Sequence, residues 1–143
     1  MITPPRILLV EDDENDVFFF KRAFESAGIP INLEVATDGR RALAILRGEA
    51  VYARRDIHPM PSLVLLDLKI PYMPGLEVLR QIRASKEMAK VIVIILTSSA
   101  MESDLKAAYE LGANSYLVKP SLQEDRKELA KLIARYWLEK NQV

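Results

Sequence analysis

The sequence contains no cysteine and only one histidine, and these absences remove whole classes of function. Without cysteine there can be no disulfide bond, no thiolate nucleophile and no cysteine-ligated metal site. Neither sign of charge is in excess, because 20 Lys and Arg residues balance 20 Asp and Glu residues. A chain without net charge gives no indication of electrostatic attraction to nucleic acid or to an anionic membrane.

Long hydrophobic stretches are missing as well. The longest aliphatic run, residues 91–96, is far shorter than the roughly 20 residues that a transmembrane helix needs. The amino-terminal residues 1–6 are too few and too rich in proline to begin a signal peptide. We therefore expect a cytoplasmic protein, and the lack of cysteine fits a reducing compartment.

What remains is an ordinary globular composition, 50% hydrophobic and 28% charged. A length of 143 residues suits one domain with one hydrophobic core. We expect a single domain over residues 1–143, with its core at about residues 5–140 and no effector domain after it.

Short apolar segments alternate with amphipathic ones along the whole chain. We predict strands at residues 6–10, 32–36, 63–66, 90–96 and 115–118, each followed by a helix. Strict alternation predicts a parallel sheet with right-handed crossovers. Residues 63–66 and 90–96 have no polar side and should be central strands, whereas the alternating residues 32–36 indicate an edge strand. The predicted fold class is α/β, an open doubly wound sheet of five parallel strands.

Four of these strands end in residues capable of chemistry. Glu11 and Asp12 follow the first strand, Asp67 the third, Thr97 ends the fourth and Lys119 follows the fifth. The carboxyl ends of parallel strands share one edge of the sheet, so these residues should meet in one crevice.

Gathered carboxylates repel one another and need a compensating cation. Two carboxylates about 4 Å apart cost about 4 kcal/mol at an effective dielectric of 20. Because the available ligands are oxygens, a hard divalent ion such as Mg²⁺ is the expected partner. A carboxylate, Mg²⁺, a lysine and a hydroxyl form a set suited to phosphoryl transfer, with Asp67 as nucleophile and Thr97 and Lys119 neutralising charge.

The order and spacing of these motifs resemble the receiver domains of two-component response regulators over the whole chain. The matching segments are Glu11-Asp12-Asp13, Asp67 with Pro71 and Gly75, Thr97-Ser98, and Tyr116-Leu-Val-Lys119-Pro120. The resemblance implies the flavodoxin-like (βα)5 receiver fold with strand order 2-1-3-4-5. It also implies a phosphorelay protein that accepts a phosphoryl group from a partner histidine kinase. Such a domain is not an enzyme, beyond catalysing its own phosphotransfer and dephosphorylation.

The resemblance also assigns a role to each residue of the motifs. Asp67 is implied to be the phosphoacceptor, Thr97 the switch hydroxyl, Tyr116 the switch aromatic, and Lys119 the lysine that precedes a cis proline, Pro120. The Mg²⁺ ligands are implied to be Asp12 and Asp67 directly, Glu11 through water, and the backbone carbonyl of Lys69. The output is implied to be a change of the surface formed by residues 101–111, 115–118 and the last helix.

Two further features resemble the single-domain regulators that are paired with bacterial phytochrome kinases. One is the long loop at residues 49–62, in which Arg54 and Arg55 are expected to be solvated. The other is the extended last helix. Its inner side is predicted to carry five apolar residues, and Trp137 and Leu138 are predicted to extend the apolar surface beyond what the core requires. We therefore expect a homodimer through this helix. The five predicted inner residues are Leu122, Leu129, Leu132, Ile133 and Tyr136.

Other interpretations stay open at this point. Asp13 or Asn15 should cap the helix that follows the first strand, and Asp12 could do the same. Tyr116 could be a core residue. The chain could be a degenerate receiver that acts only as an interaction module, or an aspartyl-phosphate hydrolase. Such a hydrolase would need an acid where Lys69 stands. Lys69 and Ser99 occupy positions that tune phosphate lifetime in the family, so that lifetime is left open.

Overall fold

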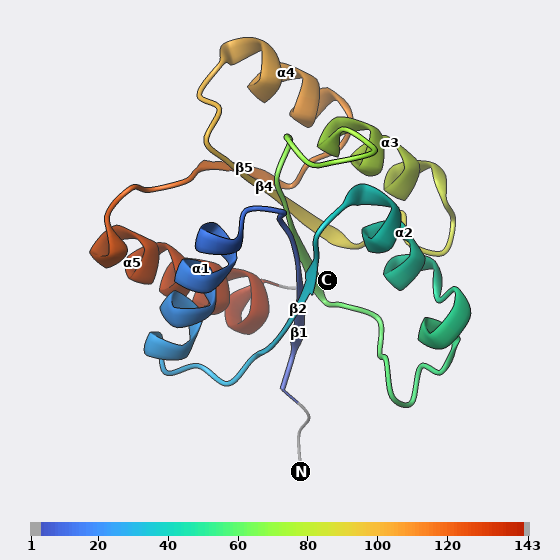
Figure 1. Cartoon of the computed structure of the whole chain (residues 1–143), viewed down its shortest axis with the longest axis horizontal. Helices are drawn as coiled ribbons and strands as arrows, with labels where there is room; N and C mark the ends of the chain where they lie inside the picture. Colours follow the sequence, from blue (N-terminus) through green and yellow to red (C-terminus); the bar gives the residue numbers. More distant parts are fainter. Residues whose placement is uncertain (1–3, 142–143) are drawn as a thin grey trace.

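The computed structural model describes residues 4–141 and contains a parallel sheet of five strands between two layers of helices (Figure 1). The sheet order is β2-β1-β3-β4-β5, so the predicted doubly wound fold and strand order are confirmed. The alternating strand β2 lies at an edge, as its pattern predicted, and β3 and β4 lie inside. The strands are β1 (Arg6–Val10), β2 (Asn32–Ala36), β3 (Leu63–Leu66), β4 (Ile92–Thr97) and β5 (Ser115–Val118).

The helices alternate with the strands and cover both faces of the sheet. Figure 1 shows α1 and α5 together on one face and α2, α3 and α4 on the other. A π-helical extension, Ala134–Lys140, continues α5, and a short 3-10 turn, Ala50–Ala53, follows α2. The helices are α1 (Glu14–Ser26), α2 (Gly39–Arg47), α3 (Gly75–Ala84), α4 (Glu102–Glu110) and α5 (Gln123–Ile133).

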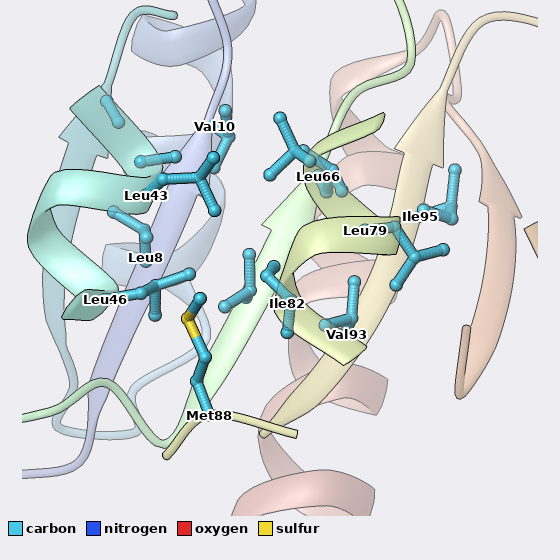
Figure 2. Packing of buried hydrophobic residues seen from close by; sticks show 14 of the residues in the cluster. Leu8, Val10, Leu43, Leu46, Leu66, Leu79, Ile82, Met88, Val93 and Ile95 are labelled. Carbon is cyan, nitrogen blue, oxygen red and sulfur yellow. The ribbon is translucent and has the colours of Figure 1, made fainter. Parts of the chain in front are cut away.

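Each face of the sheet carries its own hydrophobic core, because successive side chains of a strand point to opposite faces. Figure 2 shows one core, in which Leu8 of β1 and Val93 of β4 face Leu43 of α2 and Leu79 of α3. The other core packs Phe20 and its neighbours in α1 against α5. All residues of β3 and β4 are buried, in agreement with their continuous apolar sequences.

The prediction for the inner side of the last helix was partly wrong. Ile133 is buried and Leu129 packs partly against the core, but the side chains of Leu122, Leu132 and Tyr136 are 65%, 63% and 56% exposed. Leu122 precedes the helix as its N-cap residue and so has no helical face to share.

The inner stripe of this helix is shifted by one position from the predicted one. It runs through Ala130, Ile133, Ala134 and Trp137, which follow the three- and four-residue spacing of a helix face. Trp137 and Leu138 therefore pack against the core and do not extend an exposed apolar surface. The exposed apolar residues of this helix are Leu132 and Tyr136 instead.

Arg55 is not a solvated loop residue, contrary to expectation. Its guanidinium donates hydrogen bonds to the carbonyl oxygens of Ile45 at 3.0 Å and Leu46 at 2.9 Å. These carbonyls lie in the last turn of α2, where the Ile45 carbonyl also accepts the Gly48 amide at 3.3 Å. Arg55 thus joins the loop of residues 49–62 to the end of α2, together with the Glu49 amide, which donates to the Ala44 carbonyl at 3.0 Å. Arg54 does pair with Asp56 at the surface, in keeping with the expectation for that residue.

Candidate functional site

The parallel register brings four strand ends together. Val10 pairs with Leu66, and Thr97 with Val118, so the residues that follow them meet at one edge. The backbone continues this pairing beyond the strands, because the Asp67 amide donates to the Val10 carbonyl at 3.1 Å. The Lys119 amide likewise donates to the Thr97 carbonyl at 2.8 Å. The predicted convergence of Glu11, Asp67, Thr97 and Lys119 is present.

Lys119 is the centre of the site. Its ammonium group donates to Glu11 Oε1, to Asp16 Oδ2 at 2.8 Å and to Asp67 Oδ2 at 2.8 Å. The Lys119 side chain is 10% exposed, that of Glu11 2% and that of Asp67 8%, whereas that of Asp16 is 26% exposed. An ammonium group has three N–H donors, and each is engaged by a carboxylate.

Glu11 and Asp67 share this cation unequally. Burial, together with the charge of Asp67, raises the pKa of Glu11 to about 8, although Lys119 opposes the shift. Burial would also raise the pKa of Asp67, but the hydrogen bond and charge of Lys119, together with the nearby Thr97 hydroxyl, outweigh it and lower that pKa below its usual value. Burial thus favours the protonated form of Glu11, while the contacts of Asp67 favour its carboxylate form.

The Thr97 side chain is fully buried and faces Asp67, whose pKa it helps to lower. Yet within residues 4–141 no oxygen accepts a hydrogen bond of good geometry from the Thr97 hydroxyl. A buried polar group without a full partner costs about 1–3 kcal/mol. The site thus holds a donor whose hydrogen-bonding capacity is not used.

The loop after β3 approaches the site closely. The Lys69 amide donates to Asp67 Oδ1 at 3.3 Å, while the Lys69 side chain points to solvent. Gly75, the first residue of α3, lies so near that a Cβ there would be 2.3 Å from the Asp67 carbonyl oxygen. Only glycine permits this approach, so the residue type at Gly75 fixes how α3 sits beside Asp67.

The acids after β1 have separate positions. Asp13 is the N-cap of α1 and accepts the amides of Asn15 at 2.9 Å and Asp16 at 3.1 Å, so the capping role falls to Asp13. Glu11 Oε2 accepts the amide of Asp12 at 3.1 Å. The Asp12 side chain is exposed at the mouth of the site.

The donor chemistry of the site fits a hard divalent cation. Glu11, Asp12 and Asp67 supply only oxygen ligands, and three acidic side chains converge on the single cation of Lys119. Within residues 4–141 no three acidic or imidazole side chains are already arranged around a common metal position. Mg²⁺ usually binds through one or two carboxylates and keeps several waters, so it does not need such a cage.

Tyr116 connects β5 to the loop after β4. Its ring is half-buried against the core, and its hydroxyl donates to the Ser99 carbonyl at 2.9 Å. The Ser99 hydroxyl in turn donates to Asp104 in the first turn of α4 at 2.6 Å. Tyr116 therefore makes both a core contact and a polar link to the segment that begins at Thr97, and its switch role stays a prediction.

The expected cis peptide before Pro120 is absent. Every peptide bond across the described part of the chain is trans, including that between Lys119 and Pro120. The trans form is favoured for a residue before proline by about 0.5–1 kcal/mol, and the Lys119 contacts to all three acids form with this geometry.

Sequence reasoning missed Asp16. An acid three residues after an N-cap commonly has a purely local role at a helix start, and that interpretation hides a contact across the fold. One signal in the sequence could have indicated the contact. Asp16 lies in the first turn of α1, and this helix begins just after Glu11 and Asp12.

The sheet order and the acid-lysine cluster define a receiver of the two-component type. The chain matches the family described as the response regulator receiver domain over residues 7–134, and it belongs to that family. Among curated proteins it is 41% identical over 132 residues to the probable methanogenesis regulatory protein FilR2 of Methanothrix harundinacea, covering 92% of this chain and 83% of that protein.

The response regulator Rcp1 of Synechocystis sp. is 36% identical over 137 residues, covering 95% of this chain and 91% of Rcp1. The Mn²⁺-bound structure of Rcp1 superposes with a TM-score of 0.86 at 34% identity, covering 98% and 99% of the two chains. The phosphorylated cyanobacterial phytochrome response regulator RcpA superposes with a TM-score of 0.90 at 31% identity, covering 98% of each chain. The family and its phytochrome-associated members are thus similar to this chain in sequence and in fold.

None of the helices described between residues 4 and 141 is long and apolar enough to cross a membrane.

Proposed function

We propose that this receiver domain works as a phosphorylation switch, with Asp67 as the phosphoacceptor. The observation that carries this proposal is the combination of an ionised, nearly buried Asp67, a lysine bonded to it, and the buried Thr97 hydroxyl with unused capacity. A phosphoryl group on Asp67 would offer acceptor oxygens to both donors. The cation and the hydroxyl that would contact the group are therefore already beside Asp67.

The transfer step is a displacement at phosphorus. A carboxylate oxygen of Asp67 forms a bond to the phosphorus of a phosphohistidine on a partner kinase, and the P–N bond breaks. The electron pair of that bond returns to the imidazole, which then takes up a proton. Later attack of water on the phosphorus releases inorganic phosphate and restores Asp67. These two reactions are the only chemistry we assign, so the domain is a signalling protein and not a metabolic enzyme.

Glu11, Asp12, Asp67 and the backbone carbonyl of Lys69 would hold the divalent cation, which we propose to be Mg²⁺. When bound, it neutralises negative charge on the carboxylates and on phosphoryl oxygens. Glu11 would act through a bound water, and a nearby cation would favour its ionised form.

The switch follows from contacts around Thr97. In our proposal its hydroxyl donates to a phosphoryl oxygen, which draws the β4–α4 segment toward Asp67. Tyr116 is bonded to Ser99 in that segment, so its ring must adjust when the segment moves. The surface of α4, β5 and the last helix carries exposed Met101, Leu105 and Val118, which a changed partner contact could use.

Mass spectrometry after treatment with acetyl phosphate and Mg²⁺ tests the assignment. Wild-type protein should gain one phosphoryl group, and Asp67→Asn should gain none, because an amide oxygen cannot form the acyl phosphate. Equal phosphorylation of both proteins would refute the role of Asp67. Asp56→Asn is a matched control, since Asp56 is an exposed aspartate that pairs only with Arg54.

Two rivals fit the site less well. An aspartyl-phosphate hydrolase needs an acid two residues after its nucleophile, and Lys69 stands there with its side chain in solvent. A degenerate receiver that acts only as an interaction module would not retain the acid-lysine cluster. Turnover of a chromogenic phosphate ester would support the hydrolase. A lack of binding to beryllofluoride in the presence of Mg²⁺ would support the interaction module.

The partner is proposed to be a cytoplasmic histidine kinase of the bacterial phytochrome type. Support comes from the similarity to Rcp1 and to the phytochrome regulator RcpA. Nucleic acid and membranes are not proposed as partners, because the chain has no net charge. Phosphotransfer from a purified phytochrome kinase, compared with a kinase of another input class, tests this choice.

We also propose a homodimer through the last helix, now based on Leu132 and Tyr136. These side chains are one helical turn apart, and both are more than half exposed. A double substitution to serine should convert the dimer to a monomer in light scattering without changing phosphorylation. A monomeric mass of the wild-type protein at high concentration, with and without beryllofluoride, would contradict the proposal.

A further inference from the structure

Asp16 is the one member of the lysine cluster to which the proposed function gives no role. Its carboxylate Oδ2 lies 2.8 Å from Lys119 Nζ, the same separation as that of Asp67. It comes from α1, whereas the other partners of Lys119 come from the ends of β1 and β3. Its amide is bonded to Asp13, but within the described part of the chain the Asp16 carboxylate contacts no cation besides Lys119.

All hydrogen-bond donors of the Lys119 ammonium group are occupied in the unphosphorylated site. Its three N–H groups serve Glu11, Asp16 and Asp67, and no fourth is available for a phosphoryl oxygen. If Lys119 is to bind a phosphoryl group on Asp67, it must give up one present acceptor. The number of donors therefore requires an exchange of partners at this lysine.

Burial indicates which acceptor leaves. The Glu11 side chain is 2% exposed and its second oxygen is held by the amides of Asp12 and Asp13, so Glu11 cannot turn to water. The Lys119 donor that serves Asp67 can pass to the phosphoryl group, but that group brings three strong acceptor oxygens to the same lysine and so competes for a further donor. Asp16 is 26% exposed and can be hydrated at little cost, because a partly exposed ion pair is weaker than a buried one.

We infer that Asp16 is a positioning residue that holds Lys119 in the unphosphorylated state and competes with the phosphoryl group for it. This inference rests on the proposed function of Asp67. Asp16 supplies the third acceptor that keeps the lysine aligned beside Asp67. It must then release Lys119 when the phosphoryl group binds, and its negative charge opposes the new charge on Asp67. Asp16 thereby lowers the stability of the phosphorylated state.

The capping interpretation of Asp16 leads to a different expectation. If the carboxylate served only the start of α1, its removal would weaken the helix that carries the site and would lower affinity for a phosphoryl mimic. Competition predicts a higher affinity for the mimic instead. Removal of the Asp16 carboxylate frees one Lys119 donor and takes away one negative charge that repels the mimic. The direction of the change therefore separates the two roles.

The test compares the affinity of Asp16→Asn and wild-type protein for beryllofluoride with Mg²⁺, followed by ¹⁹F NMR. We expect Asp16→Asn to bind about three- to tenfold more tightly, as loss of one nearby negative charge would give. Glu14→Gln is the matched control, since Glu14 is an exposed acid in the same first turn of α1. Asp16→Glu restores the carboxylate and should return the affinity to near the wild-type value.

A second measurement needs no metal. In metal-free protein, the Lys119 ammonium protons should exchange faster with solvent in Asp16→Asn than in wild type or Glu14→Gln, because one proton loses its carboxylate. Equal exchange rates would overturn the inference. Asp16→Ser serves both measurements if Asp16→Asn does not fold.

Unchanged or weaker beryllofluoride binding by Asp16→Asn, while wild type binds, would overturn the inference and leave the role of Asp67 intact. Equal tightening in Glu14→Gln would also overturn it, because the effect would then be one of general charge. Failure of the wild-type protein to bind beryllofluoride would instead refute the proposed function on which the inference rests.

Discussion

The two edges of the sheet use cations in opposite ways. At the amino-terminal edge, Arg83 donates to the carbonyl oxygens of Ala89, Val91 and Gly112 at 2.7–2.9 Å and to the Asn114 side chain at 2.8 Å. At the carboxyl edge, Lys119 is surrounded by three carboxylates. One cation binds neutral oxygens, and the other faces an excess of negative charge.

This difference separates an edge whose hydrogen bonds are already satisfied within the fold from an edge that can still bind a cation or a phosphoryl group. Around Arg83, helix α3 and the segments that precede β4 and β5 are joined by hydrogen bonds from one guanidinium group to neutral oxygens. Around Lys119 the negative charge exceeds the positive charge, and the Thr97 hydroxyl has unused capacity. The amino-terminal edge therefore stabilises the fold, while the carboxyl edge accepts a cation and a phosphoryl group.

Replacing each cation by methionine should give the largest contrast. Lys119→Met leaves Glu11 and Asp67 facing each other and should lower the free energy of unfolding by about 3–5 kcal/mol at pH 8. Arg83→Met leaves several carbonyls without a donor and should cost about 1–3 kcal/mol. Urea unfolding measures both changes. Phosphorylation by acetyl phosphate should fail in Lys119→Met and persist in folded Arg83→Met.

The outcome that would contradict this contrast is loss of phosphorylation in folded Arg83→Met, with a normal rate in Lys119→Met. The cost of Lys119→Met should also be smaller at pH 5 than at pH 8. At the lower pH Glu11 holds its proton, so only one of the two facing carboxyl groups is charged. The cost of Arg83→Met should not depend on pH in this range, because neutral carbonyls do not titrate.

The pH dependence of stability should come from the carboxyl edge alone. The pKa of Glu11 rises from 4.5 to about 8 on folding, so between these values the folded chain holds a proton that the unfolded chain lacks. Stability in Mg²⁺-free buffer should therefore fall, by up to a few kcal/mol, as the pH rises from about 4.5 to about 8. Urea midpoints across this range measure the fall.

Glu11→Gln is the control for this prediction, because its amide cannot titrate and can still accept a hydrogen bond from Lys119. The variant should lose most of the slope, while Glu34→Gln, which removes the half-buried partner of Arg6 on the edge strand β2, should keep it. A wild-type slope no steeper than that of Glu11→Gln would show that Glu11 is ionised in the folded protein at neutral pH.

The carboxyl edge was largely predictable from sequence, because parallel topology places the residues after each strand at one edge. Glu11, Asp67, Thr97 and Lys119 were placed together by that rule alone. Asp16 was not, since it lies inside a helix and its direction depends on how α1 packs. Strand alternation and caps are local signals, whereas the contact between Asp16 and Lys119 spans the fold.

The amino-terminal edge and the last helix were less predictable for the same reason. Nothing near Arg55 or Arg83 in the sequence shows that their guanidinium groups reach backbone carbonyls of other segments. The last helix has apolar residues on more than one side, so the pattern alone did not decide between the Leu132 face and the Trp137 face. Packing against α1 and the sheet made that choice.

The smallest predicted effect tests whether the carboxyl edge is incomplete at Thr97. Thr97→Val keeps the side-chain shape and removes the hydroxyl that has no good acceptor, so the unphosphorylated protein should gain about 1 kcal/mol in urea unfolding. Affinity for beryllofluoride should fall at the same time, because the bond that the hydroxyl is proposed to make is lost. Thr37→Val, at an exposed threonine, should change neither. A loss of stability in Thr97→Val would mean that the hydroxyl already has a full partner in the unphosphorylated site, and that this edge, like the one around Arg83, is complete.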